Sequence, residues 1–491
     1  MSIFTLLSGP GNFVGPDMLY VSRAPPWGAP AEVQLPMPVR SRAVLAIAAL
    51  AGALAAVPAA APAADYRPGQ VVVRYAPGLE RSDRARVQRS TATMAARRDV
   101  IPRTRVLKIR DGSSVMEKVR ELRQRPGVLS ATPNYVARAS AYIPNDPGTP
   151  DGPVGGWQQI QWNFMPNTGI NAPDAWDNLI AAGRPGGSGV MVAVLDTGVA
   201  YRDFGKRFRR SPDLTRRIRR GYDFVDNDPY ALDHNGHGTH VASTIAESVN
   251  NGIGLTGIAY GAQILPVRVL DRLGEGDSVA IAAGIRFAAK RGAHIINLSF
   301  EFSSTVTRSQ IPDILSALRY AQRRNVLVIG ASGNAANHAV AYPARASRVV
   351  SVGAVTEHSC QADYSNTGAK LDLSAPGGGA DAIVADDPNC RPDDPPGRDI
   401  VQMTFAGSMR KFGLPRGYMG TSMAAPHVSA TAALVIASGL LGRRPTPAQL
   451  ERHLKQTADD LGKPGPDPRY GAGRVNAARA TTPSGAALPP A

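Results

Sequence analysis

The sequence has few cysteines, fewer acidic than basic residues, and no apolar run long enough to span a membrane comfortably. Its two cysteines, Cys360 and Cys390, allow at most one disulfide within the chain. Two alternatives stay open for them: one disulfide in an exported protein, or two unrelated thiols. The apolar run at 43–57 is too short to span a bilayer comfortably. We therefore expect no stable membrane anchoring.

The shortage of acidic residues is confined mainly to one part of the chain. Overall, 55 Lys and Arg face 39 Asp and Glu, a formal charge of +16. Residues 65–141 hold 17 basic and 7 acidic side chains and so account for +10 of this charge. Because most of the excess positive charge lies in this one segment and not in the rest of the chain, we expect no nucleic-acid partner.

A secretory signal is recognisable, although it does not begin at the N-terminus. Arg40 and Arg42 precede the apolar run, and Ala61-Pro62-Ala63 fits a cleavage site of the A-x-A type. This predicts a signal peptide at 37–64 that begins at Met37, and a protein exported to the extracellular space or the periplasm. Residues 1–36 are then a spurious upstream extension.

Two folded regions with different patterns follow. Residues 65–141 contain a strand at 70–76, an Arg-rich helical stretch to about Arg98, a strand at 106–110, a helix within 114–127 and an extended final piece. This order predicts a small α+β domain. The Pro-, Gly- and Asp-rich residues 143–156 read as a linker or a turn-rich segment.

The larger region alternates short apolar runs with helical patterns. Its near-continuous apolar runs fall at 189–196, 262–270, 293–300, 326–333 and 349–355, with helical spacing at 277–292 and 309–325. Such runs are typical of parallel strands covered on both faces. We predict one α/β domain with a doubly wound parallel sheet at 142–480, followed by a disordered tail at 481–491.

Polar residues at the ends of these runs are candidates for a catalytic site, since ligands of such sheets bind beyond the carboxyl ends of the strands. Asp196 ends one strand, Asn334 follows another, His237 stands between two glycines, and Ser422 opens an apolar helix. Three of them have an ordinary alternative: Asp196 as a helix-cap or turn aspartate, Asn334 as a turn former, and Ser422 as a serine that caps a helix.

Two other site types were weighed. His234, His237 and His240 are spaced by three residues, but no HExxH motif accompanies them, and His240 reads better as a packed helix residue. Residues 252–257, GIGLTG, match a dinucleotide-binding fingerprint, yet they follow a helix and precede a strand, the reverse of the required order. We expect neither zinc nor an organic cofactor.

Taken together, VLDTGV, GHGTHVA, ASGN and GTSMAAPHV resemble, in this order, the motifs of the subtilisin-like serine proteases of the subtilase family. The resemblance extends from about Asn145 to Ala480. It implies a serine endopeptidase in which Ser422 is the nucleophile, His237 the base and Asp196 its orienting acid. Asn334 would donate to the oxyanion.

The resemblance also covers the flanking regions. Residues 65–141 resemble an inhibitory propeptide with a ferredoxin-like fold that assists folding and is then removed, and AYIPNDP resembles a mature N-terminus of the thermitase type. This implies self-cleavage near Ala141-Tyr142. By resemblance, a structural Ca²⁺ would be bound by Asp146, Asp213, Val249, Asn251, Ile253 and Leu255, with two unrelated linker aspartates as the alternative.

For substrate binding, the resemblance places Gly274, Glu275 and Gly276 on one wall of the groove and Leu298, Ser299, Phe300 and Glu301 on the other. Phe300-Glu301 departs from the Leu-Gly usual in the family. The two glutamates favour basic substrate side chains, unless they are merely solvated. Residues 380–415 form an insertion before the nucleophile.

The sequence therefore predicts a secreted, calcium-stabilised, monomeric endopeptidase that is made as a zymogen, with protein or peptide substrates and its own propeptide as partners. Two alternatives remain: a selective processing protease or transpeptidase with the same acyl-enzyme, and an inactive binding protein on the same fold.

Overall fold

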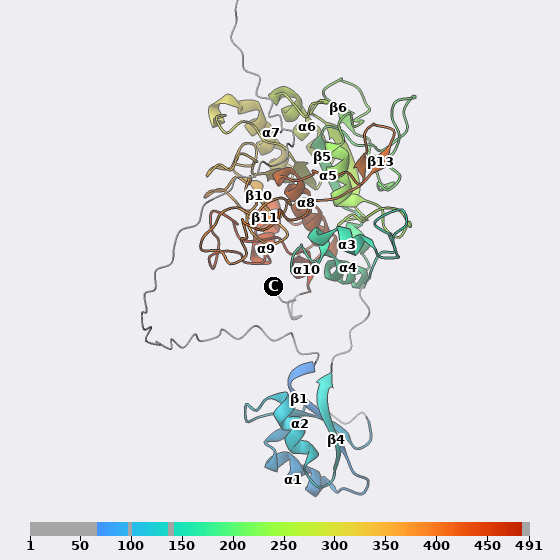
Figure 1. The fold of residues 1–491 in the computed structure, drawn as a ribbon, viewed down its shortest axis with the longest axis vertical. Helices are drawn as coiled ribbons and strands as arrows, with labels where there is room; N and C mark the ends of the chain where they lie inside the picture. Colours follow the sequence, from blue (N-terminus) through green and yellow to red (C-terminus); the bar gives the residue numbers. More distant parts are fainter. Residues whose placement is uncertain (1–65, 97–100, 136–141, 484–491) are drawn as a thin grey trace, which may run out of the picture. The chain divides into compact units, whose positions relative to one another are not determined.

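The computed structural model describes residues 66–96, 101–135 and 142–483. They form two compact units, one before and one after residues 136–141 (Figure 1). The predicted signal peptide at 37–64 and the predicted extension at 1–36 lie outside the described residues. Among the helices that are described, none combines the length and apolar character of a membrane span.

The smaller unit is a four-stranded antiparallel sheet with two helices. Its elements follow the order β1 (Tyr66–Tyr75), α1 (Arg81–Ser90), β2 (Thr93–Ala95), β3 (Thr104–Ile109), α2 (Val115–Arg123) and β4 (Val128–Tyr135). The strands lie in the order β2-β3-β1-β4. This βαββαβ order with β1 and β3 at the centre is the ferredoxin-like arrangement that the sequence predicted.

One expectation for this unit is wrong. The helical stretch predicted to reach about Arg98 ends at Ser90, and residues 93–95 pair with β3 instead. Thr93 is buried there, and Thr91 forms a hydrogen bond of 3.0 Å with it across the turn. The sequence pattern does not reveal this turn, because Arg-rich residues are equally compatible with a solvated helix.

The larger unit is built on a parallel seven-stranded sheet. Its strands lie in the order β11 (Leu373–Pro376), β10 (Val349–Val355), β9 (Leu327–Ala331), β8 (Ile295–Leu298), β5 (Met191–Asp196), β7 (Gln263–Arg268) and β6 (Tyr222–Asp223). Every pairing in this sheet is parallel. The five predicted runs form five of its strands, while β6 and β11, which the sequence analysis did not find, complete its edges.

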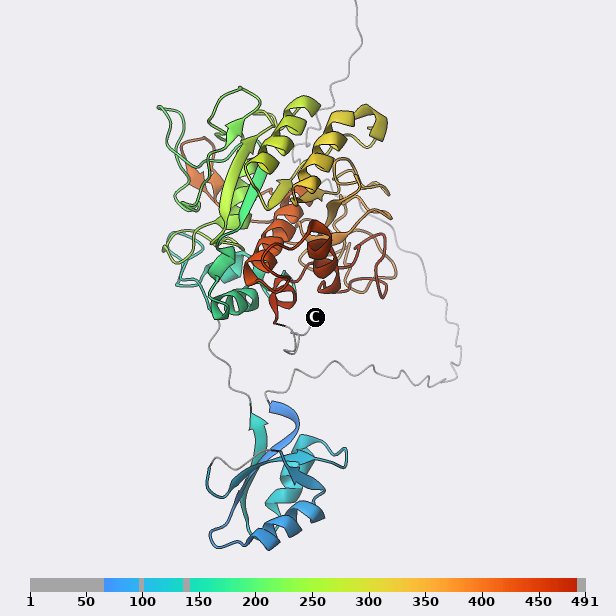
Figure 2. The same cartoon turned by 180° about the vertical axis from the view of Figure 1, so that it is seen from behind.

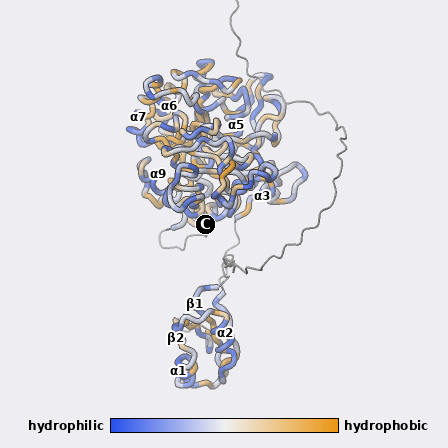
Figure 3. Tube along the Cα trace, turned by 60° about the vertical axis from the view of Figure 1, so that its left-hand side comes forward, coloured by the Kyte–Doolittle hydropathy of each residue, from blue (hydrophilic) through white to orange (hydrophobic). Residues whose placement is uncertain are grey.

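Helices cover both faces of this sheet, as predicted for a doubly wound fold (Figures 1 and 2). One face packs against α4 (Ala172–Ala181), α5 (His237–Ala246) and α8 (Thr421–Ser438). The other face packs against α6 (Ser278–Lys290) and α7 (Pro312–Arg323). Hydrophobic segments accordingly run through the interior of this unit (Figure 3).

Shorter elements complete the unit. These are α3 (Trp157–Ile160), the 3₁₀ turns η1 (Trp162–Phe164), η2 (Pro185–Gly187) and η3 (Arg308–Gln310), the hairpin β12 (Thr404–Phe405) and β13 (Phe412–Gly413), α9 (Pro447–Gln456) and α10 (Ala477–Thr481). Thr481, assigned to the tail from sequence, is instead buried at the end of α10, where its hydroxyl donates to the Ala477 carbonyl at 2.8 Å.

The strand order places a switch point at β5. The chain moves from β5 to β7 on one side and then returns through α6 to β8 on the other. Residues that follow the carboxyl ends of β5 and β8 therefore diverge around a crevice, the position where open α/β sheets bind ligands. Asp196 is the last residue of β5.

Candidate active site

Asp196 and His237 meet at this crevice. The His237 Nδ1 atom lies 2.7 Å from Asp196 Oδ1, and the same carboxylate oxygen accepts from the Thr197 backbone N–H at 2.8 Å. Asp196 is fully buried, whereas His237 keeps a quarter of its side chain exposed. A buried acid behind a partly exposed imidazole orients the ring and stabilises its charged form.

The electrostatics of His237 reflect this contact. Burial lowers its pKa, but the charge and the hydrogen bond of Asp196 outweigh burial and leave the pKa above the ordinary value of 6.5. His240, one helical turn later, behaves in the opposite way. It is buried, stacks on Tyr418 and has its pKa lowered to about 3 by burial, so it remains neutral. His240 is a packed helix residue, as predicted.

No zinc site is formed by the three histidines. His234 packs against Phe208, His237 bonds to Asp196, and His240 bonds to the Ile400 carbonyl at 3.0 Å. In the described ranges, no group of three or more His, Cys, Asp or Glu side chains is arranged to hold a metal ion.

A buried aspartate that the sequence analysis missed fixes the loop before His237. Asp233 accepts hydrogen bonds from the backbone N–H groups of Asn235 and Gly236 and from the hydroxyls of Thr197 and Thr239. These bonds join the end of β5 to the start of α5. A buried carboxylate with this many donors is a rigid support, but a lone Asp in a sequence looks like any turn residue.

Glycines let the backbone pack closely here. A Cβ on Gly238 would lie 2.1 Å from the Gly198 carbonyl oxygen and 3.1 Å from Asp196 Oδ1. A side chain at residue 238 would therefore separate the two loops that carry the acid and the base.

Ser422 is on the first turn of α8, but it is not the cap of that helix. The N-cap is Gly420, with φ of 147°, and no side chain caps the helix. The capping alternative is therefore wrong. The Ser422 side chain is half-buried and lies at the positive end of an 18-residue helix.

The position of Ser422 depends on Pro426 and Ser299. Pro426 has no N–H, so it cannot donate to the carbonyl of Ser422 four residues earlier. The Ser299 hydroxyl donates to that carbonyl instead, at 2.7 Å. Asn297 Nδ2 donates to the Ser299 hydroxyl oxygen, and Asn297 Oδ1 accepts from Ser429 at the same distance of 2.8 Å. The chain of bonds ties α8 to the end of β8.

Asn334 faces the N-terminus of α8. Its Oδ1 accepts from the Thr421 backbone N–H at 2.8 Å and from the Thr421 hydroxyl at 3.0 Å. With the oxygen occupied, the Nδ2 donors remain for another partner. A Cβ built on Gly420 would lie 3.6 Å from Asn334 Nδ2 and 3.7 Å from the Ser422 backbone nitrogen. Both nitrogens thus border the space beside Gly420.

The candidate substrate residues divide into two groups. Leu298 ends β8, and Gly330 of β9 pairs with it, so the segments after the two strands run side by side. Glu301 connects them: both of its carboxylate oxygens lie 3.0 Å from the Asn334 backbone nitrogen. Ser299 is buried, Phe300 is half-buried and Glu301 is exposed.

The second group, Gly274–Gly276, lies on an exposed loop. Asn235 Nδ2 donates to the Arg272 carbonyl at 3.0 Å, which connects this loop to the loop before His237. Glu275 is held through its backbone, which donates to Asp271 and accepts from it. Glu301 therefore contacts Asn334 directly, and Glu275 does not.

The residues predicted to bind calcium also come together. The buried carboxylate of Asp146 accepts from the backbone N–H groups of Asn250 and Asn251, at 3.0 and 3.1 Å. The buried Asp213 accepts from Asn251 Nδ2 at 2.8 Å and from the Leu255 N–H at 3.0 Å. Val249 and Ile253 belong to the same loop, and Ile253 N–H donates to Asn251 Oδ1.

Burial raises the pKa values of the acidic side chains in this cluster. Burial, aided by the charge of Asp146, raises the pKa of Asp213 to about 7. Glu247, which the sequence analysis missed, is also buried, its pKa is raised well above the ordinary value by burial and by Asp213, and its Oε2 has no hydrogen-bond partner among the described residues. Buried acids without a cation beside them fit a hard cation with oxygen ligands.

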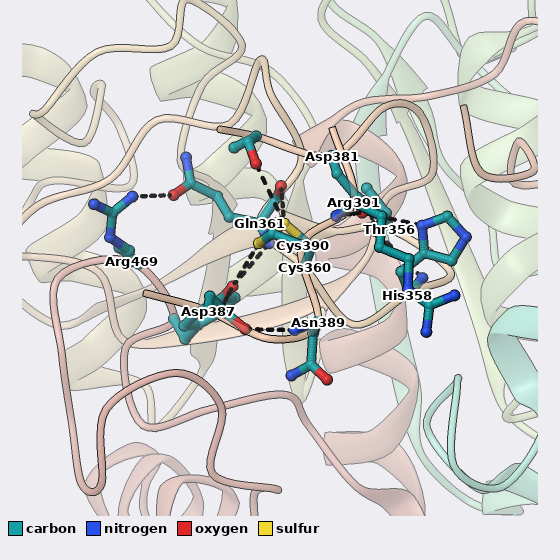
Figure 4. The surroundings of a disulfide bond; sticks show 12 residues. Thr356, His358, Cys360, Gln361, Asp381, Asp387, Asn389, Cys390, Arg391 and Arg469 are labelled. Atoms are coloured by element: carbon teal, nitrogen blue, oxygen red, sulfur yellow. Dashed lines mark hydrogen bonds and ion pairs between the residues drawn. A yellow bond between two sulfur atoms is a disulfide. The ribbon is translucent and has the colours of Figure 1, made fainter. Parts of the chain in front are cut away.

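The insertion at 380–415 contacts two other parts of the domain. One is the loop before His237, and the other is the segment after β10 that contains Cys360. Thr404 of β12 donates to the Gly236 carbonyl at 2.6 Å, next to His237. Cys360 and Cys390 form a disulfide (Figure 4). Beside it, the backbone N–H of Arg391 donates to Asp381 at 2.7 Å. The disulfide thus fixes the start of the insertion to the segment after β10.

Comparison with known proteins identifies the family. The model of the subtilase family matches residues 187–473, and that of the fervidolysin N-terminal prodomain matches residues 53–134. The chain belongs to the subtilase family. Within the chain, a prodomain of the fervidolysin type precedes the subtilase domain, whose fold with its parallel sheet is subtilisin-like.

Individual relatives agree with this assignment. A thermophilic serine proteinase of Bacillus sp. (strain AK1) is 32% identical over 422 residues, which cover 85% of this chain and 88% of that protein. Subtilisin Savinase of Lederbergia lenta is 39% identical over 66% of this chain and 99% of its own length. The solved structure of a protease from Pseudoalteromonas arctica PAMC 21717 has a TM-score of 0.55 and 30% identity, over 69% of this chain and 99% of that one. This subtilase is thus a serine protease with a prodomain.

Proposed function

We propose that this subtilase is a secreted endopeptidase that cleaves peptide bonds through an acyl-enzyme on Ser422. The observation that carries the proposal is the 2.7 Å contact between His237 and Asp196, both beside the crevice at the end of β5. A serine hydroxyl is a poor nucleophile and needs a base of this kind.

In this mechanism, His237 takes the proton of the Ser422 hydroxyl as its oxygen attacks the substrate carbonyl carbon. Asp196 holds the imidazole with Nδ1 as the donor, which leaves Nε2 to accept the proton, and stabilises the imidazolium that forms. His237 then gives this proton to the leaving amine, which leaves the acyl group on Ser422. In the second half of the reaction, water attacks the acyl carbon, His237 takes a proton from the water, and it returns that proton to the Ser422 oxygen as the acid product leaves.

The negative charge that develops on the carbonyl oxygen requires donors. Asn334 Nδ2 and the Ser422 backbone N–H supply them, because both border the same space beside Gly420. A donor of this kind lowers the barrier by about 2.7 to 4 kcal/mol. The positive end of α8 adds to the stabilisation.

We further propose that residues 65–141 are an inhibitory propeptide that the enzyme removes itself at about Ala141-Tyr142, and that residues 142–480 hold the peptidase domain. Residues 136–141 lie outside the described part of the chain. The match to a prodomain supports removal of the smaller unit as a whole.

A structural Ca²⁺ is part of the proposal. Asp146, Asp213 and Asn251, with the carbonyls of Val249, Ile253 and Leu255, would hold it and neutralise the buried acids. Two aspartates brought to one loop, with no positive side chain of the described residues bonded to either, favour this view over two unrelated linker residues.

Substrate selectivity is proposed to come from Glu301. In this proposal, the substrate side chain next to the attacked carbonyl lies near Glu301, because the Glu301 carboxylate contacts the backbone of Asn334, whose amide would hold that carbonyl. Although the residue as a whole is exposed, partial loss of hydration raises the pKa of this carboxyl, the Asn334 N–H lowers it, and no described Lys, Arg or His side chain forms an ion pair with it. A Lys or Arg at this substrate position would supply the missing charge.

The test of selectivity compares Glu301→Gln with the wild type on two peptides that differ only in Arg or Leu before the cleaved bond. We expect the wild type to prefer the Arg peptide and the variant to lose most of that preference. Glu275→Gln, on the loop that does not contact Asn334, is the matched control and should keep it. An unchanged preference in Glu301→Gln would refute the assignment.

The test of the overall function is self-processing. Wild-type protein should appear without residues 65–141 and should hydrolyse casein, whereas Ser422→Ala should keep the propeptide and be inactive. A Ser422→Ala protein that is processed at the same rate in the absence of other proteases would contradict the proposal. Product analysis with an added amine acceptor separates hydrolysis from transpeptidation.

A further inference from the structure

Tyr142, the first described residue of the larger unit, is held at its backbone nitrogen by a carboxylate. The Tyr142 N–H lies 2.7 Å from Asp177 Oδ1, on α4. Asp177 is half-buried and forms no ion pair with any described Lys, Arg or His. An aspartate whose single partner is one neutral amide is a weakly compensated charge.

The rest of Tyr142 is also fixed. Its ring packs at 6.2 Å from Trp176 and 6.0 Å from Tyr260, measured between ring centroids. Its hydroxyl accepts from Asn250 Nδ2 at 2.6 Å, within the loop proposed to bind calcium. The chain is therefore anchored from Tyr142 onward by side-chain and backbone contacts together.

We propose that cleavage of the Ala141-Tyr142 bond creates an ion pair between the new α-ammonium group of Tyr142 and Asp177, and that this pair stabilises the mature enzyme. The inference rests on the self-processing proposed above. Hydrolysis adds one water: Ala141 gains a carboxylate, and the Tyr142 nitrogen becomes an ammonium group that keeps its place beside Asp177.

The physical gain comes from charge. Before cleavage, Asp177 accepts one hydrogen bond from a neutral amide. After cleavage, the same nitrogen carries a full positive charge and three N–H donors at a distance already suited to a charge-assisted hydrogen bond. The Tyr142 nitrogen and Asp177 Oδ1 are already 2.7 Å apart in this structure. Other cleavage positions would leave Tyr142 with a neutral amide and would form no ion pair at this nitrogen.

The experiment uses the full chain with Ser422→Ala, so that it cannot process itself. One half is left intact, and the other half is cut in trans by a trace of wild-type enzyme, with N-terminal sequencing to identify the new terminus. Asp177→Asn and Asp177→Ser are each introduced into this protein, and the melting temperature of every form is measured.

We expect sequencing to give Tyr142, and both substitutions to lower the melting temperature of the cut form by about 2 to 4 °C more than that of the intact form. Asp174→Asn, one turn earlier on α4, should change both forms equally. Equal shifts of the two forms with Asp177→Asn, or a terminus other than Tyr142, would overturn the proposal. A wild type that cannot cut at all would instead contradict the protease function itself.

Discussion

The Ser299 hydroxyl donates to the Ser422 carbonyl at 2.7 Å, and it does so where Pro426 has removed the helical donor. The backbone of the proposed nucleophile is thus held by a side chain that follows the end of β8. Pro426, in the second turn of α8, removes one helical hydrogen bond to the Ser422 carbonyl. The Ser299 hydroxyl, just after β8, donates a hydrogen bond to this carbonyl instead.

Ser299→Ala should therefore impair catalysis without preventing folding. It leaves the partly buried Ser422 carbonyl without this donor, a cost of about 1 to 3 kcal/mol in the free energy of unfolding. Because Ser422 then loses its exact position, we expect kcat to fall by about tenfold or more while KM changes little. Ser303→Ala, an exposed serine nearby, should leave both unchanged. A normal kcat in Ser299→Ala would show that the bond does not position the nucleophile.

The oxyanion role of Asn334 can be tested by removing its amide. Asn334→Ala should lower kcat by about 10²- to 10³-fold, because one of two donors to the developing charge is lost. Asn337→Ala, three residues later, is the control and should retain wild-type kcat. A kcat within a factor of three of the wild type in Asn334→Ala would remove this residue from the mechanism.

The pH dependence of activity follows from His237. Its pKa lies above 6.5 because Asp196 stabilises the charged form more than burial opposes it. The base works only when neutral, so kcat/KM should rise with pH through a midpoint above 6.5. Asp196→Asn should lower kcat by about 10⁴-fold. An acidic limb with a midpoint well below 6.5 in the wild type would contradict this account of the contact.

Calcium should stabilise the folded enzyme. If the ion binds at a concentration about 100-fold above its Kd, chelation should lower the melting temperature by roughly 5 to 10 °C. Asp213→Asn should weaken the response to added Ca²⁺, whereas Asp203→Asn, outside the loop, should not. A melting temperature that is the same with and without chelator would argue against the ion.

Sequence pattern alone predicted much of this fold, for a clear physical reason. The runs that became β5, β7, β8, β9 and β10 are buried on both faces, so they are apolar throughout and stand out. β6 has two residues, too few to show a pattern, and β11, LSAP, has four residues like β8 but lacks a continuous apolar run. The turn at Ala92 was missed because Arg-rich sequence around it fits a solvated helix.

For the site, sequence found the residues whose types define the chemistry and missed those that support them. Asp233, Asn297 and Glu247 each accept a hydrogen bond from a residue far away in the chain, namely Thr197, Ser429 and Met403, and sequence alone does not show these partners. The same holds for Asp177, whose partner is a backbone nitrogen 35 residues earlier. Such roles become visible only when distant segments are placed together.

The most direct test of the central claim is covalent labelling of the nucleophile. Wild-type enzyme treated with a fluorophosphonate should carry a single adduct on Ser422, found by mass spectrometry of its peptides, and His237→Ala should react at least 100-fold more slowly. Labelling on another residue, or equal rates for the two proteins, would contradict a serine activated by His237.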